Sequence, residues 1–267
     1  MTSIDTQVTR PTRLADLVGD VPAFHADVHG RRPATFHCGV DTDFLAPADL
    51  WAMLDRGLLV HPYFRVERAG VRVPVADVAV TRSVQKKPLP AYADAAAIAA
   101  HFADGHTVVL DEAGHWHAGV KALLAGLRED LEAEVHAAAV LTPPGGAIVV
   151  DGQAFVVQLA GQSTGDVVVS PGEVGYLPAG GRATAVGESL QLVVTVTPPT
   201  ARDIALLALA GFLKSEHVER IAGNHHALTP AEKVAWLRTA LAAYLSDVDV
   251  VALAGRAARS RQRGGQV

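Results

Sequence analysis

Residues 147–161 read AIVVDGQAFVVQLAG, and this stretch predicts the fold of the chain. Two apolar, β-branched runs flank Asp151-Gly152, and both of these residue types accept the positive φ of a tight turn. We therefore predict a β-hairpin with a two-residue turn at this point. Three further strand-like segments follow at residues 166–170, 173–178 and 190–196. Short strands at such close spacing are typical of a small antiparallel barrel or double sheet.

The composition excludes several classes of function. The 267 residues are 49% hydrophobic and 19% charged, with a formal net charge of −5, so the chain has no basic footprint for nucleic acid or an anionic membrane. A single cysteine, Cys38, excludes an intrachain disulfide framework and a cysteine-rich zinc module. No apolar run approaches the roughly 18 residues that span a bilayer, and the N-terminus lacks a signal-peptide pattern. We therefore expect a cytoplasmic protein without membrane partners.

Composition changes along the chain predict its organisation. The expected parts are a disordered tail at 1–12, an α/β lead-in at 13–117, a barrel core at 137–199, a helical C-terminal region at 200–255 and a second disordered tail at 256–267. Pro198-Pro199 marks the change from strand to helix.

Local signals place the helices and one more hairpin. Residues 46–59 and 118–135 carry apolar side chains at helical spacing, and the alternating residues 62–74 turn at a glycine, which predicts a hairpin. Asp94 is a predicted N-cap for the helix that follows it. Thr229 precedes a proline and a glutamate in the pattern of a capping box, which predicts another helix start.

Several short motifs occur in a characteristic order. They are GRRP at 30–33, FRV at 64–66, FADGHTVVL at 102–110, LTPPG at 141–145, FVVQLAG at 155–161 and PGEVGYLP at 171–178. Together, over residues 14–199, they resemble the JmjC-type cupin family, which includes the ribosomal oxygenases that hydroxylate ribosomal proteins. The resemblance implies an α+β chain with a mainly β core. Its expected fold is a double-stranded β-helix (a cupin/JmjC jelly roll) over residues 13–199, with an N-terminal α/β lead-in and a helical C-terminal region that forms a homodimer.

The same resemblance implies an iron site that this sequence lacks. In the family, a His-x-Asp pair and a second histidine hold Fe(II), and a basic residue binds 2-oxoglutarate. The interval for the pair, residues 146–154, contains Ile148 and Val150 but no histidine, and residues 179–185 also lack one. The position of the basic residue reads Gln162-Ser163-Thr164. We therefore predict a pseudoenzyme that needs no cofactor and binds a peptide, protein or small molecule at the barrel mouth.

Four polar residues are candidates for that binding site. His136 lies on the first predicted barrel strand, and Asp151 is the only carboxylate of the central stretch, which also contains Gln153. Arg182 lies near the position of the missing third ligand and could neutralise an anionic ligand at the barrel mouth. Structural roles remain open for these residues: an edge imidazole for His136, a turn former for Asp151 and a surface ion pair for Arg182.

Two catalytic alternatives remain. The first is an active metal-dependent oxygenase that uses Fe(II) and 2-oxoglutarate, with relocated ligands drawn from His25, His115, His117 and His136. His25 and His29 would face each other if residues 23–29 are helical. We interpret most of the 12 histidines as surface or loop imidazoles. The second alternative is a metal-free isomerisation or cyclisation with Asp151 or His136 as the acid or base.

Overall fold

The structure is a computed structural model that describes residues 13–37, 44–84, 87–216, 218, 225–249 and 252–257. The described residues fall into two compact units. The first contains the chain up to Asp130 together with Val135–Thr197, and the second contains Leu131–Glu134 and the chain from Pro198 onward. The predicted tail at 1–12, residues 258–267 of the tail predicted at 256–267, and also Cys38, lie outside the described residues. Residues 256 and 257 are helical, so the predicted tail begins too early.

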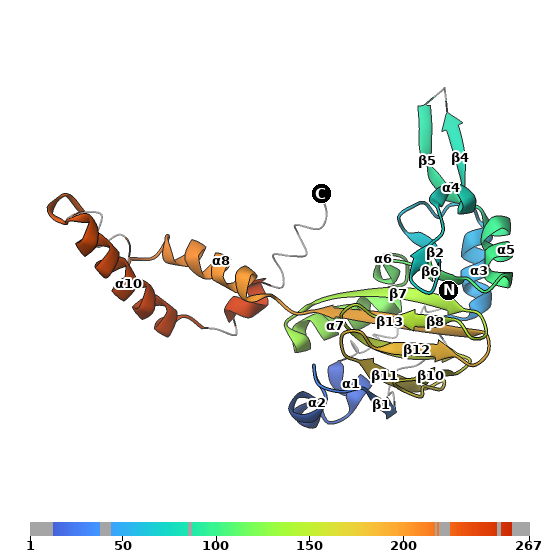
Figure 1. The fold of residues 1–267 in the computed structure, drawn as a ribbon, viewed down its shortest axis with the longest axis horizontal. Helices are drawn as coiled ribbons and strands as arrows, with labels where there is room; N and C mark the ends of the chain where they lie inside the picture. The colour runs from blue at the N-terminus through green and yellow to red at the C-terminus, as the bar shows by residue number, and fades with distance from the viewer. Residues whose placement is uncertain are drawn as a thin grey trace, which may run out of the picture. The chain divides into compact units, whose positions relative to one another are not determined.

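Two antiparallel sheets form the core of the first unit (Figure 1). The larger sheet has the strand order β1-β11-β9-β13-β7-β6-β2-β3, and the smaller sheet has the order β10-β12-β8. The strands of the larger sheet are β1 (Ala34–His37), β2 (Phe64–Arg68), β3 (Val71–Arg72), β6 (Thr107–Leu110), β7 (Glu134–Thr142), β9 (Gln153–Ala160), β11 (Glu173–Leu177) and β13 (Ser189–Thr197). Those of the smaller sheet are β8 (Ala147–Val149), β10 (Ser163–Gly165) and β12 (Arg182–Ala185). Apolar side chains from both sheets pack into one core, which confirms the predicted α+β class with a jelly-roll core.

The predicted hairpin across Asp151-Gly152 is wrong. β8 pairs with β12 in the smaller sheet, whereas β9 pairs with β11 and β13 in the larger one. The six consecutive residues 154–159 of β9 are all buried, so this strand lies in the interior of its sheet. Both of its edges are hydrogen-bonded to other strands, which leaves no edge for β8. Asp151-Gly152 therefore carries the chain from one sheet to the other.

The segment predicted as a strand at residues 166–170 is also different in the structure. Val169 bridges to β10 through two hydrogen bonds of 2.9 Å with Ser163, and the Asp166 N–H donates to the Arg182 carbonyl of β12 at 3.1 Å. Val167 and Val169 are nevertheless buried against β11. A Cβ atom at Gly175 would lie 2.8 Å from the Val169 side chain, so glycine permits this close packing. The segment is held by side-chain packing and by isolated hydrogen bonds, without a regular ladder.

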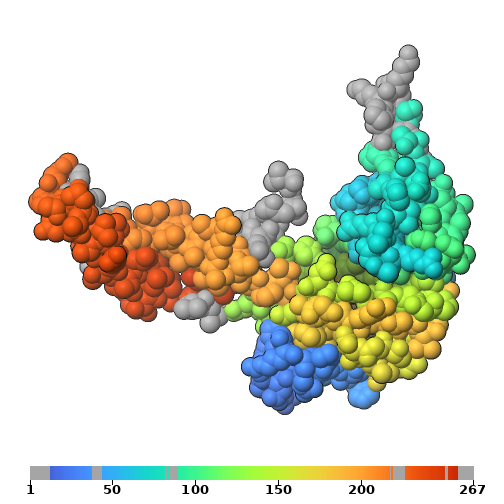
Figure 2. Space-filling view, in the orientation of Figure 1, coloured from blue at the N-terminus to red at the C-terminus, as the bar shows by residue number. Residues whose placement is uncertain are grey.

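The lead-in follows the sequence signals closely. The β2–β3 hairpin forms, and the Asp94 carboxylate accepts hydrogen bonds of 3.1 Å from the Ala96 and Ala97 N–H groups. The helices are α1 (Leu14–Val18), α2 (Val21–Asp27), α3 (Pro47–Asp55), α4 (Val75–Val78), α5 (Ala95–Ala103), α6 (Ala113–Trp116) and α7 (Ala118–Leu131), and a separate two-stranded sheet pairs β4 (Ala79–Val84) with β5 (Lys87–Ala93). The helix predicted to reach residue 135 ends earlier, because β7 begins at Glu134. Figure 2 shows the lead-in (blue to cyan) directly against the barrel strands (green to orange).

The start of α1 is fastened to the end of α7 by one carboxylate. Asp130 accepts hydrogen bonds from the Leu14 N–H at 2.8 Å and from the Arg13 Nε at 3.1 Å. Burial by itself would raise the pKa of Asp130, but these bonds and the Arg13 charge outweigh it and lower that pKa. Asp130 is therefore ionised and paired in the folded chain.

The second unit is helical. It contains α8 (Ala201–Phe212), the 3-10 helix η1 (His225–Ala227) and α10 (Pro230–Asp247). Thr229 forms the predicted capping box, accepting from the Glu232 N–H, and the rings of Phe212 and Tyr244 join the two long helices with centroids 5.7 Å apart. Within the part of the chain that the structure describes, no helix has the length and apolar character needed to cross a membrane.

Candidate functional site

The centre of the barrel is filled with apolar side chains. The cluster consists of Val109, Val140, Ile148, Val150, Ala154, Val156, Val167, Val169, Leu177, Ala183 and Val193. Ile148 on β8 and Ala183 on β12 are direct partners in register and are 8% and 1% exposed. They occupy the two segments in which the family resemblance places iron ligands. Because hydrocarbon side chains offer no donor atoms, these residues do not fit Fe(II).

The position of the 2-oxoglutarate clamp is equally unsuited to that cosubstrate. Ser163 donates a hydrogen bond of 2.9 Å to the Gln158 Oε1 and accepts one of 2.6 Å from the Gln191 Nε2. All three side chains are buried and uncharged. Their polar groups satisfy one another, and the group contains no cation to bind the distal carboxylate of 2-oxoglutarate.

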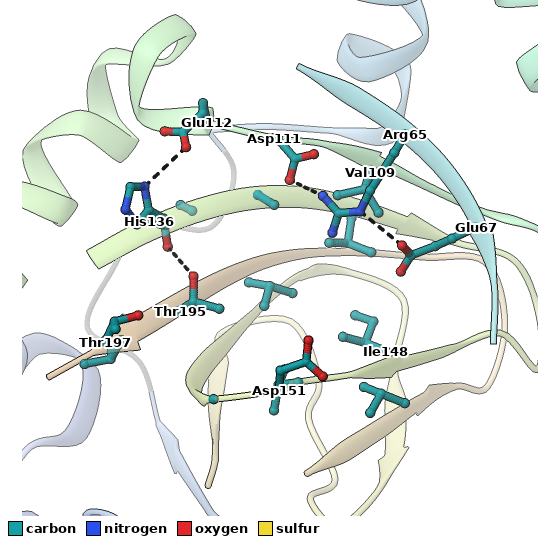
Figure 3. A pocket seen from close by; sticks show the side chains of 18 residues that line it. Arg65, Glu67, Val109, Asp111, Glu112, His136, Ile148, Asp151, Thr195 and Thr197 are labelled. Atoms are coloured by element: carbon teal, nitrogen blue, oxygen red, sulfur yellow. Dashed lines mark hydrogen bonds and ion pairs between the residues drawn. The ribbon is translucent and has the colours of Figure 1, made fainter. Parts of the chain in front are cut away.

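A cavity of about 370 Å³ opens beside this apolar centre (Figure 3). Ile148, Val150 and Val193 form part of its apolar lining. Its charged and ionisable lining residues are Arg65, Glu67, Asp111, Glu112, His136 and Asp151. The cavity therefore combines an apolar wall with a rim that carries more carboxylates than cations.

Arg65 is the single arginine of the rim, and it is already paired. Its Nε lies 3.0 Å from the Glu67 Oε2, and its Nη1 contacts the Asp111 Oδ1. Burial would lower the pKa of Arg65, but the two carboxylates outweigh it and raise that pKa. Phe64 and Val66 are buried on one face of β2, so Arg65 and Glu67 project together from the other face. One guanidinium thus meets two carboxylates, and the group is electrically negative.

Glu112 and His136 form a second polar pair at the rim. The Glu112 Oε1 lies 3.2 Å from the His136 Nδ1, and this carboxylate orients the imidazole at the cavity edge (Figure 3). The backbone of Glu112 is in the left-handed region, with φ of 53°, where it starts α6. Such a conformation is uncommon for a residue with a side chain and is concentrated at functional sites. Just after it, the Trp116 Nε1 donates to the Asp111 carbonyl at 3.1 Å and closes the turn.

The structure brings two of the four predicted site residues together. His136 and Asp151 both line the cavity, and Figure 3 shows the Asp151 carboxylate directed into it. Gln153 lies elsewhere and accepts a hydrogen bond of 2.8 Å from the Tyr176 hydroxyl. Arg182 is exposed on β12, where its backbone N–H bonds Asp166 at 2.7 Å, and its side chain does not line the cavity.

The sequence interpretation missed four charged residues of the rim, which are Arg65, Glu67, Asp111 and Glu112. The signal for the first two is the alternation of residues 64–67, which puts both charges on one face of a strand. The other two follow directly after the buried strand β6. Pairing of β2 with β6 then brings these two sequence-distant pairs together.

The histidines offered as relocated iron ligands are dispersed over several elements. His25 lies on α2, His115 on α6, His117 at the end of α6 and His136 on β7. Among the residues that the structure describes, no group of three or more His, Cys, Asp or Glu side chains could hold a metal ion.

Two facing antiparallel sheets around one core define this unit as a double-stranded β-helix of the cupin type. Among solved structures, the chain is similar to YcfD of Escherichia coli, with 15% identity, a TM-score of 0.50 and coverage of 88% of this chain and 70% of that one. A second structure, described as YcfD, a ribosomal oxygenase from Escherichia coli, has 17% identity, a TM-score of 0.50 and coverage of 87% and 68%. This likeness shows that the chain has a JmjC-like cupin fold. By sequence, the chain matches no protein-family model and no curated protein.

Proposed function

We propose that this chain is a non-catalytic JmjC-like cupin that uses its barrel cavity for binding. The observation that carries the proposal is the pairing of Ile148 with Ala183 in the barrel centre. Hydrocarbon replaces ligand atoms there, and the uncharged Ser163 group replaces the cosubstrate clamp. The jelly-roll core is well packed, but it lacks the iron ligands and the 2-oxoglutarate clamp. This combination favours a role in ligand binding over oxygenase catalysis.

The rim charges define the ligand class. Four carboxylates and one guanidinium line the cavity, and the guanidinium is already ion-paired with Glu67 and Asp111. Asp151 lies on the side of the cavity opposite Arg65, beside the apolar Ile148 (Figure 3). A positive group on an apolar stem complements this lining, because the stem covers hydrocarbon and the charge meets carboxylate. We propose that the ligand is a basic side chain of a peptide or protein.

Loading the purified chain with Fe(II) and 2-oxoglutarate under anaerobic conditions tests the absence of oxygenase chemistry. After exposure to oxygen, we expect neither stoichiometric iron nor formation of succinate. Retained iron together with 2-oxoglutarate decarboxylation would refute the non-catalytic assignment.

Ligand class is tested separately by NMR titration with the amides of N-acetyl-arginine, N-acetyl-lysine and N-acetyl-norleucine. The two cations should shift resonances of the cavity residues, and neutral norleucine should bind more weakly. Asp151→Asn should weaken cation binding, whereas Asp55→Asn, an exposed change on α3 outside the cavity lining, should not. Equal binding of all three amides would contradict the charge argument.

The Glu112–His136 pair favours a second candidate function, proton transfer without a metal. A carboxylate-oriented imidazole at a cavity edge is a common general base, and Asp151 lines the same cavity. If the chain converts a bound metabolite to a rearranged product, and His136→Ala does not, this candidate is favoured over binding alone.

We also propose that the second unit mediates a homodimer. Leu206, Leu209 and Leu213 on and just after α8 are 57%, 45% and 67% exposed. Val234, Leu237 and Leu245 on α10 are 50%, 44% and 44% exposed. Exposed apolar side chains in this number on two adjoining helices are typical of a protein interface. A second copy of the chain presents the same apolar face, so it is a suitable partner.

A further inference from the structure

Two histidines at the end of α2 face each other at close range. The Nδ1 atoms of His25 and His29 are 3.2 Å apart. α2 ends at Asp27, but the chain continues in a turn in which the His29 N–H bonds the Phe24 carbonyl at 2.9 Å. This turn keeps His29 one helical turn from His25, so the two imidazoles lie on the same side.

The separation of these nitrogens matches two ligands of one metal ion. Zinc–imidazole bonds are about 2.0–2.1 Å long, so two nitrogens on one ion are about 3.4 Å apart at a tetrahedral angle and about 3.0 Å apart at a right angle. The observed distance of 3.2 Å falls between these values. We propose that His25 and His29 chelate Zn²⁺ through their Nδ1 atoms, at a site separate from the barrel cavity.

The His29 ring is held in place before any ion binds. It stacks on Phe24, with centroids 5.4 Å apart and planes inclined by 22°, and Phe24 is buried. The side chain of Gln153 hydrogen-bonds His29, and Gln153 itself accepts from the Tyr176 hydroxyl at 2.8 Å. Tyr176 in turn accepts a hydrogen bond of 2.8 Å from the Gly30 N–H. Ligating imidazoles are typically fixed in this way by an outer layer of hydrogen bonds.

Metal binding requires one change of tautomer in the pair, because a neutral imidazole binds a metal through the nitrogen that carries no hydrogen. Without an ion, one Nδ1–H donates to the other Nδ1. Zn²⁺ binding would shift that hydrogen to the Nε2 atom of the same ring, so that the Nδ1 atoms of both rings are free to bind the ion.

Bound Zn²⁺ would fasten the end of α2 to the turn that leads into β1. Since His29 is hydrogen-bonded to Gln153 on β9, this ion would also stabilise the attachment of the amino-terminal helices to the larger sheet. Water completes the coordination, because the pair supplies two protein ligands.

Isothermal titration of the full chain with Zn²⁺ at pH 7.5, after chelator treatment, tests this site. His25→Ala and His29→Ala should each weaken the binding at least about tenfold, since even the loss of an outer-shell partner costs 10–100-fold. Gln153→Ala should weaken it less than either ligand change. His226→Ala is the control, because this exposed histidine lies on η1 in the second unit, and it should leave the affinity unchanged.

A thermal melt keeps the test valid if His29→Ala disturbs packing on Phe24. His25 is exposed, so His25→Ala should fold normally. Zn²⁺ should raise the melting temperature of the unaltered chain and not that of His25→Ala. Unchanged Zn²⁺ affinity in both ligand variants, or an equal thermal shift with and without His25, would overturn the proposal.

Discussion

Replacing Ile148 by alanine is the sharpest test of the apolar barrel centre. The change deletes three carbon atoms from a side chain that is only 8% exposed. At about 0.8 kcal/mol for each buried carbon, the lost burial amounts to about 2.4 kcal/mol. Because Ile148 lines a cavity, the space created adds little to this cost. For a chain of this size, we expect the melting temperature to fall by roughly 5–10 °C.

The neighbouring Val149 provides the matched control. It lies on the same strand, β8, but its side chain points the other way and is 53% exposed. Val149→Ala should therefore cost well under about 1 kcal/mol. Urea unfolding of both variants, followed by circular dichroism, measures the two free energies. Equal effects of the two changes would refute the reasoning, because position 148 would then not be packed in the barrel.

Three further predictions concern other parts of the chain. Leu209→Glu should convert a dimer to a monomer in size-exclusion chromatography with light scattering. Asp130→Asn should lower the free energy of unfolding near neutral pH, and the difference from the unaltered chain should shrink as the pH falls below about 4, because the lowered pKa of Asp130 confers stability only while that carboxylate is ionised. Tyr176→Phe should cost about 1–2 kcal/mol, measured by urea unfolding, since the buried hydroxyl bonds Gly30 and Gln153.

Each of these predictions has a result that would contradict it. The dimer proposal fails if the unaltered chain is monomeric, or if the exposed control Thr239→Glu dissociates it as effectively as Leu209→Glu. A pH-independent difference for Asp130→Asn would mean that its ion pair contributes nothing. No loss of stability in Tyr176→Phe would show that the hydroxyl is equally well hydrated in the unfolded chain.

Local physics explains which features could be predicted from the sequence. The caps at Asp94 and Thr229 formed as expected because a carboxylate or hydroxyl bonds N–H groups only two or three residues away. The β2–β3 hairpin formed because alternation and a glycine turn act within one short segment. The sequence also shows directly that positions 148 and 183 carry no metal-binding side chain, because this depends only on which residues stand there.

Strand partnership and the composition of the cavity were decided by the tertiary structure. Asp151-Gly152 has the local chemistry of a hairpin turn, yet β9 is buried and already paired at both edges, so β8 had to join the other sheet. The acidic rim likewise arises because β2 pairs with β6, which brings Arg65 beside Asp111 from 46 residues further along the chain. Such contacts depend on which strands share an edge. That choice is set by burial of the whole core, and no short segment of sequence encodes it.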